Sequence, residues 1–256
     1  MIDSILVIIR PDIHICKVSD TLQGRKLKQI VKRCINILDM NQRITGIIDF
    51  IKKAEKLKTE LRHSWTSDAK RQESVAEHTW SACLLAMTLF DEISIKVQEA
   101  RTLKMIIIHD LGEAIIGDIP VFEVSKRQNK KFENEKKAIR KIVTDITDKK
   151  LASEIVDLWE EFEEKKTPEA LLARACDKLD VLLQHLNTDI KTWDKGDYQK
   201  SPYYCESDFN FDSFIRKLKD KVNFDTMKAL ENAGLLDKVS MDHRELWKKQ
   251  KTKSKI

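Results

Sequence analysis

Glycine and proline are scarce in this sequence, with six and four residues among 256. Both are common in turns, so their scarcity argues against a protein of many short strands, and the abundant Leu, Ile, Lys and Glu favour helices. No apolar run reaches the length of a membrane span. The apolar run 5–9 is short, is followed by Arg10-Pro11 and lacks the basic start of a signal peptide. We therefore expect an all-α protein with no membrane partner.

Paired cysteines and a strong excess of one charge are also missing. The five cysteines are an odd number without a CxxC pair, and Cys83 and Cys176 fall in apolar helical contexts, which favours reduced thiols and a cytoplasmic location. Charged residues make up 35% of the chain, yet the net charge is only +5. That balance suits a small anionic substrate and is too mild to indicate nucleic acid, and the basic run 248–255 is interpreted as a solvated tail.

A chain of this length with 41% hydrophobic residues can bury a sizeable core in one large domain. No internal repeat or low-complexity linker divides it. Residues 1–39 differ from the rest in their residue pattern, with a short β-like apolar run followed by a basic stretch. We predict an N-terminal extension of unknown role (1–39), a main helical domain (40–193) and a C-terminal helical extension packed on the same domain (194–256).

Capping residues and apolar spacing predict helices along the main domain. Ser74, with Glu77 three residues later, has the pattern of a capping box and precedes an apolar stripe that includes His78. Thr167-Pro168 begins another helix. The predicted helices cover residues 44–61, 74–89, 97–114, 132–147, 151–164, 167–192, 211–222, 224–233 and 241–249.

Residues with metal-ligand side chains lie on these helices in the order His78, His109-Asp110, Asp177. His109 and Asp110 follow four large apolar residues, where an imidazole and a carboxylate are costly to bury without a partner. Glu113, four residues after His109, would share its helix face, and Asp110 would flank the same groove. Two imidazoles and two carboxylates suit Mn, Co, Fe, Ni, Zn or Mg without selecting one. The sequence therefore indicates one divalent metal ion.

Each of these residues has an ordinary structural explanation when it is taken alone. A single histidine on an apolar stripe, such as His78, is more often a core residue, and a His-Asp dipeptide is common. Asp177 has Arg174 and Lys178 as neighbours on its own helix. Only their joint, inward-facing placement favours a metal site. The other histidines, at positions 14, 63, 185 and 243, lack such company and are interpreted as surface or packing residues.

Several spaced blocks resemble a known family. Segments 71–78 (RQESVAEH) and 109–120 (HDLGEAIIGDIP) resemble the HD superfamily of metal-dependent phosphohydrolases, and more narrowly the branch of bacterial 5′-deoxynucleotidases. Segments 158–163, 167–170 and 175–180 agree, so that the resemblance covers about residues 42–193. It implies an HD-domain helical bundle with peripheral N- and C-terminal segments. It also implies hydrolysis of (deoxy)nucleoside 5′-monophosphates to nucleoside and phosphate, and a homodimer.

The resemblance assigns metal ligation to four residues: His78, His109, Asp110 and Asp177. It implies that Glu113 activates or positions the attacking water, and that Asp118 assists catalysis and contacts the deoxyribose. The substrate-binding residues it implies are Arg62 for the phosphate and Trp65 for exclusion of a ribose 2′-hydroxyl. Arg71 is a second candidate, either for the phosphate or for a structural ion pair.

The residues leave alternatives open. Glu113 could orient His109 instead of acting on water, and Asp118 could cap its own turn. The chain lacks the Gly-Tyr-Pro signature of cyclic-dinucleotide phosphodiesterases, and the residues after Asp110 differ from the acidic pair of guanosine tetraphosphate hydrolases. An HD-domain hydrolase of another phosphate ester, or a catalytically inactive nucleotide-binding HD module, are the competing hypotheses.

Overall fold

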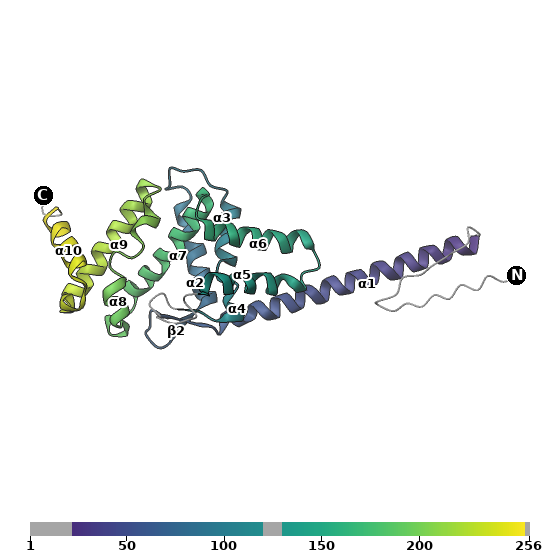
Figure 1. Ribbon diagram of the computed structural model, residues 1–256, viewed down its shortest axis with the longest axis horizontal. Helices are drawn as coiled ribbons and strands as arrows, with labels where there is room; N and C mark the ends of the chain where they lie inside the picture. The colour runs from purple at the N-terminus through teal and green to yellow at the C-terminus, as the bar shows by residue number, and fades with distance from the viewer. Residues whose placement is uncertain (1–21, 120–129, 254–256) are drawn as a thin grey trace.

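A computed structural model describes residues 22–119 and 130–253, so the apolar run 5–9 lies outside the described residues. Helices dominate it (Figure 1), which confirms the prediction of an all-α fold. The α-helices are α1 (Leu22–Ala54), α2 (Val75–Leu89), α3 (Glu99–Ile108), α4 (Glu113–Ile116), α5 (Lys131–Ile142), α6 (Lys149–Glu164), α7 (Pro168–Asn187), α8 (Lys195–Lys200), α9 (Ser213–Asn232) and α10 (Met241–Lys253). The 3₁₀ turns are η1 (Glu55–Lys58), η3 (Val143–Asp145), η4 (Ile190–Thr192), η5 (Glu206–Phe209) and η6 (Leu236–Lys238).

Helix α7 runs through the middle of the bundle and packs against α2, α3, α6 and α9. Its residues are buried on most sides, and Leu172, Ala173, Cys176 and Leu179 have no exposed surface. The small side chains among them let neighbouring helices approach closely, while the leucines fill the remaining space. Polar residues carried on α7 are thereby held inside the core.

Local capping signals place the helix starts where the sequence predicts them. The Ser74 hydroxyl accepts from the Glu77 backbone N–H and the Glu77 carboxylate accepts from the Ser74 backbone N–H, which confirms the capping box of α2. Thr167 accepts from Ala170 N–H at the start of α7, with Pro168 as the first helical residue. These caps set the starts of the helices that carry His78 and Asp177.

The predicted helix 97–114 is broken in the structure. Helix α3 ends at Ile108, and α4 begins at Glu113. Between them the chain makes tighter bonds, from Leu111 N–H to Ile108 C=O and from Glu113 N–H to Asp110 C=O. Gly112 lies in this turn, and glycine is a poor helix former. His109 and Glu113 therefore do not stack on one regular helix face.

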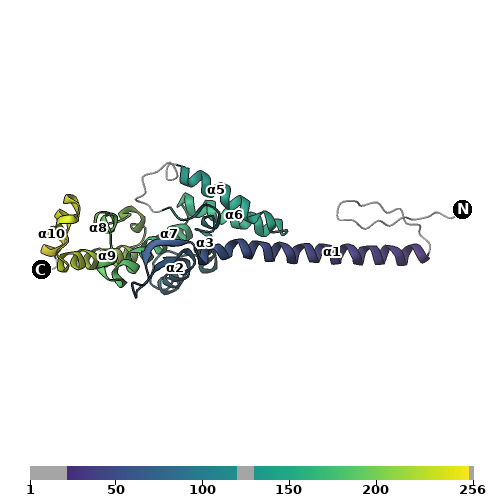
Figure 2. The same cartoon turned by 90° about the horizontal axis from the view of Figure 1, so that it is seen from below.

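The predicted helix 44–61 ends early, because α1 stops at Ala54, η1 follows, and Leu61 already begins a short antiparallel hairpin. Strand β1 (Leu61–Trp65) pairs with β2 (Gln72–Ser74), with Leu61 opposite Ser74 and Trp65 opposite Gln72. Each strand is too short to show the two-residue periodicity that marks a strand in a sequence. The hairpin leads directly into α2 and lies beside the bundle (Figure 2).

Two further predicted boundaries differ from the structure. Helix α1 is continuous across the predicted boundary at 39/40, and residues 211–233, predicted as two helices, lie mostly in the single helix α9. Phe209, Ile215 and Val222 share the main core, while Trp193, Met227 and Trp247 belong to a second, smaller cluster. The division into three parts stays a prediction. Among the described helices, none has the length and apolarity that crossing a membrane requires.

Gly46 sets how closely α1 approaches the body of the protein. A Cβ at this position would overlap the backbone oxygen of Asp145 in η3. Alanine would favour the helix by about 1 kcal/mol, but a clash with backbone costs roughly 1–3 kcal/mol. We expect Gly46→Ala to lower the free energy of unfolding, measured by urea denaturation. Thr45→Ala, on the exposed side, is the control and should be neutral or stabilising; an equally stable Gly46→Ala would contradict this packing.

Candidate metal centre and pocket

His78, His109, Asp110 and Asp177 converge from three parts of the chain. His78 Nε2 lies 3.4 Å from Asp177 Oδ1 and 3.9 Å from Asp110 Oδ2. His109 Nε2 lies 3.1 Å from Asp110 Oδ2 and 3.9 Å from Asp177 Oδ1. Ligand atoms bound to one ion at 2.0–2.2 Å lie roughly 3–4.3 Å from one another. The spacing of the four side chains fits a single ion.

Both imidazoles are oriented by their other ring nitrogen. His78 Nδ1 lies 2.7 Å from Asp180 Oδ2, and His109 Nδ1 lies 2.6 Å from the backbone oxygen of Ile106. A carboxylate and a carbonyl oxygen only accept, so the proton of each neutral ring belongs on Nδ1. The Nε2 lone pair of each ring is then directed at the two carboxylates, which is the usual arrangement of metal-binding histidines.

The two Nε2 atoms also test whether a metal fits. Both are buried and have no hydrogen-bond partner among the described residues, although His78 itself is fully buried. An unpaired buried acceptor is costly, and a cation between the imidazoles and the carboxylates would satisfy both nitrogens. The donor set therefore fits a divalent ion with nitrogen and oxygen ligands.

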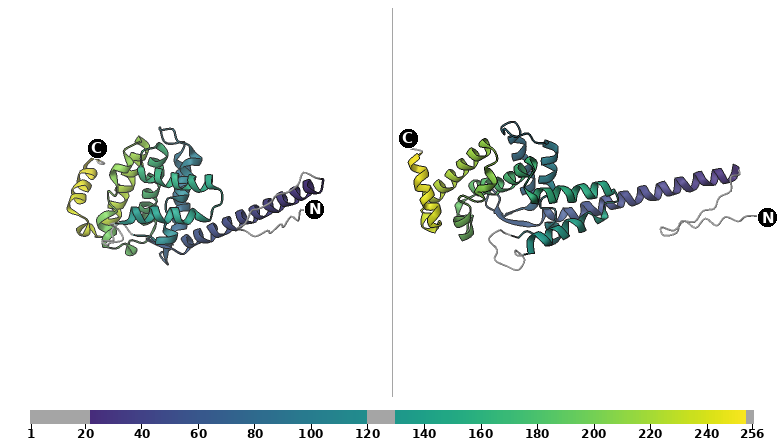
Figure 3. Two further views of the ribbon diagram at one scale, coloured as in Figure 1. Left: turned by 45° about the vertical axis from the view of Figure 1, so that its right-hand side comes forward. Right: turned by 45° about the horizontal axis from the view of Figure 1, so that its top comes forward.

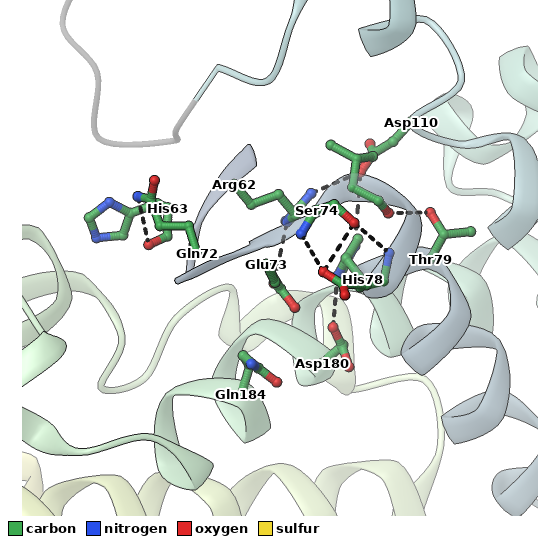
Figure 4. Close-up of polar contacts among 12 residues, drawn as sticks. Arg62, His63, Gln72, Glu73, Ser74, His78, Thr79, Asp110, Asp180 and Gln184 are labelled. Atoms are coloured by element: carbon green, nitrogen blue, oxygen red, sulfur yellow. Dashed lines mark hydrogen bonds and ion pairs between the residues drawn. The ribbon is translucent and has the colours of Figure 1, made fainter. Parts of the chain in front are cut away.

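Arg62 extends from β1 into this cluster (Figure 4). Its Nη1 donates to Asp110 Oδ2 at 2.9 Å, and its Nε lies 3.7 Å from Glu73 Oε1. Burial by itself would lower the pKa of Arg62, but Asp110, Asp118 and other carboxylates nearby raise it above its ordinary value. Burial raises the pKa of Glu73 to about 7, against the opposing effect of His78 and Arg62. Arg62 is thus a permanent positive charge at the edge of the cluster.

Glu113 and Asp118 lie in the same pocket as Arg62. Glu113 is buried as the first residue of α4, and its Oε2 has no hydrogen-bond partner in the described chain. Burial, and then the carboxylates of Asp110 and Asp118, raise the pKa of Glu113 well above its ordinary value. Gly117 (φ 77°) ends α4 in a conformation that favours glycine, which turns the chain so that Asp118 joins the pocket wall.

Two lysines and a histidine network complete the pocket. Lys178 Nζ lies 2.9 Å from Asp177 Oδ2, and Lys131 lines the wall near Glu135. On the opposite side His63 Nε2 lies 3.1 Å from Asp197 Oδ2, and the hydrogen bond to Asp197 raises the pKa of His63. The remaining wall includes Ser64, Val181, Leu182, His185, Ser201 and Tyr204. Near the candidate metal ligands the pocket carries charges of both signs, and farther away it is mixed in character.

Trp65 and Arg71 are not brought to this pocket wall. The backbone oxygen of Trp65 accepts from Gln184, and its side chain is not among the pocket-lining residues. Arg71 is half exposed and forms an ion pair with Glu77, next to the capping box. This contact matches the second of the two roles predicted for Arg71, a structural ion pair. Of the two arginines, Arg62 is the one that lines the pocket.

Sequence reasoning missed five residues that the structure places at the site: His63, Lys131, Lys178, Asp180 and His185. Asp180 carried a usable signal, because it lies three residues after Asp177 and so near the same face of α7. Lys178 was named only as a helix neighbour of Asp177, a pairing that the structure shows. The other three had no signal, since a lysine or histidine on a charged helix is usually solvated or packed. His63 and His185 line the pocket instead of being ordinary surface or packing residues.

Comparison with known proteins identifies the family. The HD domain family matches residues 54–219, which is more than half of the chain. The chain belongs to the HD domain family. The 5′-deoxynucleotidase HDDC2 of Dictyostelium discoideum is 30% identical over 194 residues, covering 73% of this chain and 95% of that protein. HDDC2 of Danio rerio is 37% identical over 141 residues, covering 54% and 68%.

Solved structures agree with this membership. A crystal structure of a "predicted metal-dependent phosphohydrolase" from Magnetospirillum magnetotacticum is similar, with a TM-score of 0.62 and 26% identity. The similarity covers 78% of this chain and 96% of that one. The resemblance to the HD superfamily is thereby confirmed, together with the HD-domain helical fold. The matched range also reaches past residue 193 into α9.

Asp180 is expected to act on metal binding by holding His78. Asp180→Asn keeps the shape but no longer supplies a charged acceptor, and losses of such partners typically weaken metal affinity by about 10- to 100-fold. We expect a loss of that size when Mn²⁺ or Co²⁺ binding to this HD domain is titrated calorimetrically. Asp208→Asn, on η5 beside Arg174, is the matched control and should bind normally. Unchanged affinity in Asp180→Asn would remove this role.

Proposed function

We propose that this protein is a metal-dependent phosphomonoesterase that hydrolyses deoxynucleoside 5′-monophosphates to nucleoside and phosphate. The curated relatives that this chain matches carry the name 5′-deoxynucleotidase, and the structural neighbour is described as a predicted metal-dependent phosphohydrolase. One observation carries the proposal. Two buried imidazole Nε2 atoms without partners face two carboxylates, at the wall of a pocket that also holds Arg62.

The residues proposed to hold the ion are His78, His109, Asp110 and Asp177. When bound, a divalent cation neutralises phosphate charge and makes a water molecule more acidic. The donor set is compatible with Mn, Co, Fe, Ni, Zn or Mg and selects none of them. Asp180 and the Ile106 carbonyl would keep both rings in the ligating orientation.

Protein groups around the ion suit a phosphate monoester. The guanidinium of Arg62 offers a planar pair of donors to phosphate oxygens, and Lys131 and Lys178 add positive charge in the same pocket. Glu113 is the proposed proton acceptor for the attacking water, since its unpaired carboxylate and raised pKa are those of a base. The bond between phosphorus and the ester oxygen would then break, and the nucleoside 5′-hydroxyl would leave.

The sugar is proposed to lie on the Asp118 side of the pocket. Asp118 lines the wall next to Glu113, and its backbone N–H donates to Glu60 Oε1 at 2.9 Å, so that its own carboxylate is not needed to cap the turn. Past it, Ser64, Val181 and Leu182 give a partly apolar surface for a nucleoside. The role proposed for Trp65, exclusion of a 2′-hydroxyl, would have to be exerted from outside this wall.

The two alternative functions account for less of the geometry of this site. A catalytically inactive nucleotide-binding HD module has no need for an unpaired buried carboxylate beside the ligand set, whereas Glu113 supplies one. Another phosphate ester is compatible with the metal ligands but has less support from the names of the relatives. The absence of a nucleic-acid partner, the cytoplasmic location and the homodimer stay predictions. The described cysteines are free, which agrees with reduced thiols.

Glu113→Gln tests the proton acceptor. The amide cannot take a proton, while the metal ligands are unchanged. We expect the variant to retain the ion, measured by elemental analysis, and to lose phosphatase activity by roughly 100-fold or more. Glu133→Gln, near the start of α5, is the control and should keep full activity. Near-normal turnover in Glu113→Gln would make Glu113 a bystander.

Substrate choice tests the proposed function directly. Phosphate release should be faster from deoxynucleoside 5′-monophosphates than from ribonucleotides, in a panel measured with several divalent metals. No release from any nucleotide with any metal would favour the inactive module. A narrower difference in Trp65→Ala would support a role of Trp65 in excluding the 2′-hydroxyl. An unchanged difference would assign sugar selection to the pocket wall.

A further inference from the structure

Helix α1 carries an apolar repeat that the proposed function does not use. Seven of its residues recur at alternating spacings of four and three: Ile30, Cys34, Ile37, Asn41, Ile44, Ile48 and Ile51. A strict seven-residue period is the pattern of helices that pair with other helices, since a single amphipathic helix on a globular body follows a 3.6-residue period. We call these seven residues the α1 seam.

Most of the α1 seam faces away from the body of its own chain, and Ile51 at its end borders a groove on the body. Ile30, Ile37, Ile44 and Ile51 are 58%, 45%, 48% and 51% exposed. The opposite face makes the internal contact, because Gly46 packs tightly against Asp145 and is about 200° around the helix from Ile44. Figures 1 and 3 show the first part of α1 extending well beyond the bundle.

A projecting helix of this composition needs a partner. Isolated helices in water are marginal, and β-branched isoleucine lowers the intrinsic helix propensity further. Nine large apolar side chains of α1 are 40–60% exposed. Five of them belong to the α1 seam, and the other four, Ile35, Leu38, Met40 and Ile47, lie outside it around the helix. A standard protein interface takes roughly 800 Å² from each partner, so the pairing also needs apolar surface beside the seam.

We propose that two copies of this chain pair through the α1 seam in an antiparallel arrangement about a two-fold axis near Asn41. The seam is symmetric about this point, so that Ile30 of each copy meets Ile51 of the other, and Ile37 meets Ile44. Antiparallel pairing about a perpendicular axis makes a closed, isologous interface. Asn41 lies at the centre, where a polar residue specifies register in paired helices.

The distribution of charged residues along α1 favours antiparallel over parallel pairing. The first half of α1 has no acidic residue before Asp39. Its basic residues are Arg25, Lys26, Lys28, Lys32 and Arg33. The second half contains Asp39 and Asp49 beside its basic residues. A parallel pair would place the two basic halves side by side, and like charges at that distance repel. The antiparallel pair places each basic half along the mixed-charge half of the other copy.

The interface would also cover an apolar groove on the body. Ile51 belongs to the α1 seam and also lines a groove of about 500 Å³, whose wall includes Ile107 and Leu151 on α3 and α6. Both of these side chains are exposed, at 57% and 44%. The N-terminal half of the other copy's α1 would end near this groove, so that seam and groove form one continuous surface.

The mass of the particle that the full chain forms in solution tests the pairing. We expect sedimentation equilibrium to give twice the chain mass for the unmodified protein. In Ile37→Glu/Ile44→Glu the dissociation constant should rise by roughly 100-fold or more, because each copy would bury two charges. Phosphate release per chain should not change, since neither residue touches the pocket. Helix content should fall by no more than the projecting part of α1 contributes, because that part loses its partner. Leu246→Glu, on the exposed face of α10, is the control and should stay dimeric.

A dimer that survives Ile37→Glu/Ile44→Glu would overturn the proposal. A monomeric unmodified chain would also overturn the proposal, and two further measurements would then show what covers the α1 seam instead. Association after deletion of residues 1–21 would indicate that these residues cover the seam. A membrane covers it if the chain sediments with vesicles that contain anionic lipid.

Cysteine cross-linking tests the direction. In an antiparallel pair, residues near position 41 of the two copies meet, whereas Cys34 of one copy lies near Ile48 of the other. Mild oxidation should therefore link Asn41→Cys/Cys34→Ser into a covalent dimer far more than the Cys34→Ser parent. Restoring Cys34 to that parent should add no linked product. Cross-linking through Cys34, with none at position 41, would indicate a parallel pair and would overturn the antiparallel arrangement.

Discussion

The hydrogen bond between His78 and Asp180, 2.7 Å long, joins α2 to α7 in the core and directs the free imidazole nitrogen toward Asp177. Both side chains are buried, so neither exchanges this contact for water without cost. The close packing of α2 on α7 makes the bond available, and the bond in turn determines which nitrogen is left to bind an ion. The other proposed ligands, at the end of α3, only complete a geometry that this helix pair establishes.

Five carboxylates line one pocket, and the mutual repulsion of the four nearest the candidate metal centre, Asp110, Glu113, Asp118 and Asp177, has to be offset. Asp110 is held by Arg62 and His109, and Asp177 by Lys178 and His78. Among the described residues Glu113 makes no ion pair of this kind, and burial, with the charges of Asp110 and Asp118, raises its pKa. Asp110 and Asp177 are the proposed ligands and are held as carboxylates, whereas Glu113 is left as the proposed base. A cation at the centre would reduce the strain of the whole arrangement.

The hairpin β1–β2 and helix α1 have different roles in the two proposals. The hairpin β1–β2 brings Arg62 to the pocket through contacts with the bundle, whereas α1 leads away from it (Figure 2). The site and the proposed dimer seam therefore lie on separate surfaces. Substitutions in the α1 seam can alter association without touching the ligands, which allows the two proposals to be tested independently.

Signals that act over a few residues were readable in the sequence. The capping box at Ser74, the Thr167-Pro168 start and the apolar stripe of α2 depend on neighbours within one or two turns, so they determined the helices and the inward direction of His78. The family blocks added the ligand set. Helix ends with weak local signals, such as the break after Ile108, were not readable, because regular spacing continues through them.

The contacts that only the tertiary structure decided join residues far apart in the chain. Asp180 meets His78 across 102 positions, Arg62 meets Asp110 across 48, and His63 meets Asp197 across 134. No local pattern predicts which of these side chains meet. The same packing leaves Trp65 and Arg71 outside the pocket wall. The sequence by itself determined the helical class and the residues able to bind a metal; the packing of α2, α3 and α7 decided which of their atoms face one another, because burial and orientation arise only when distant segments meet.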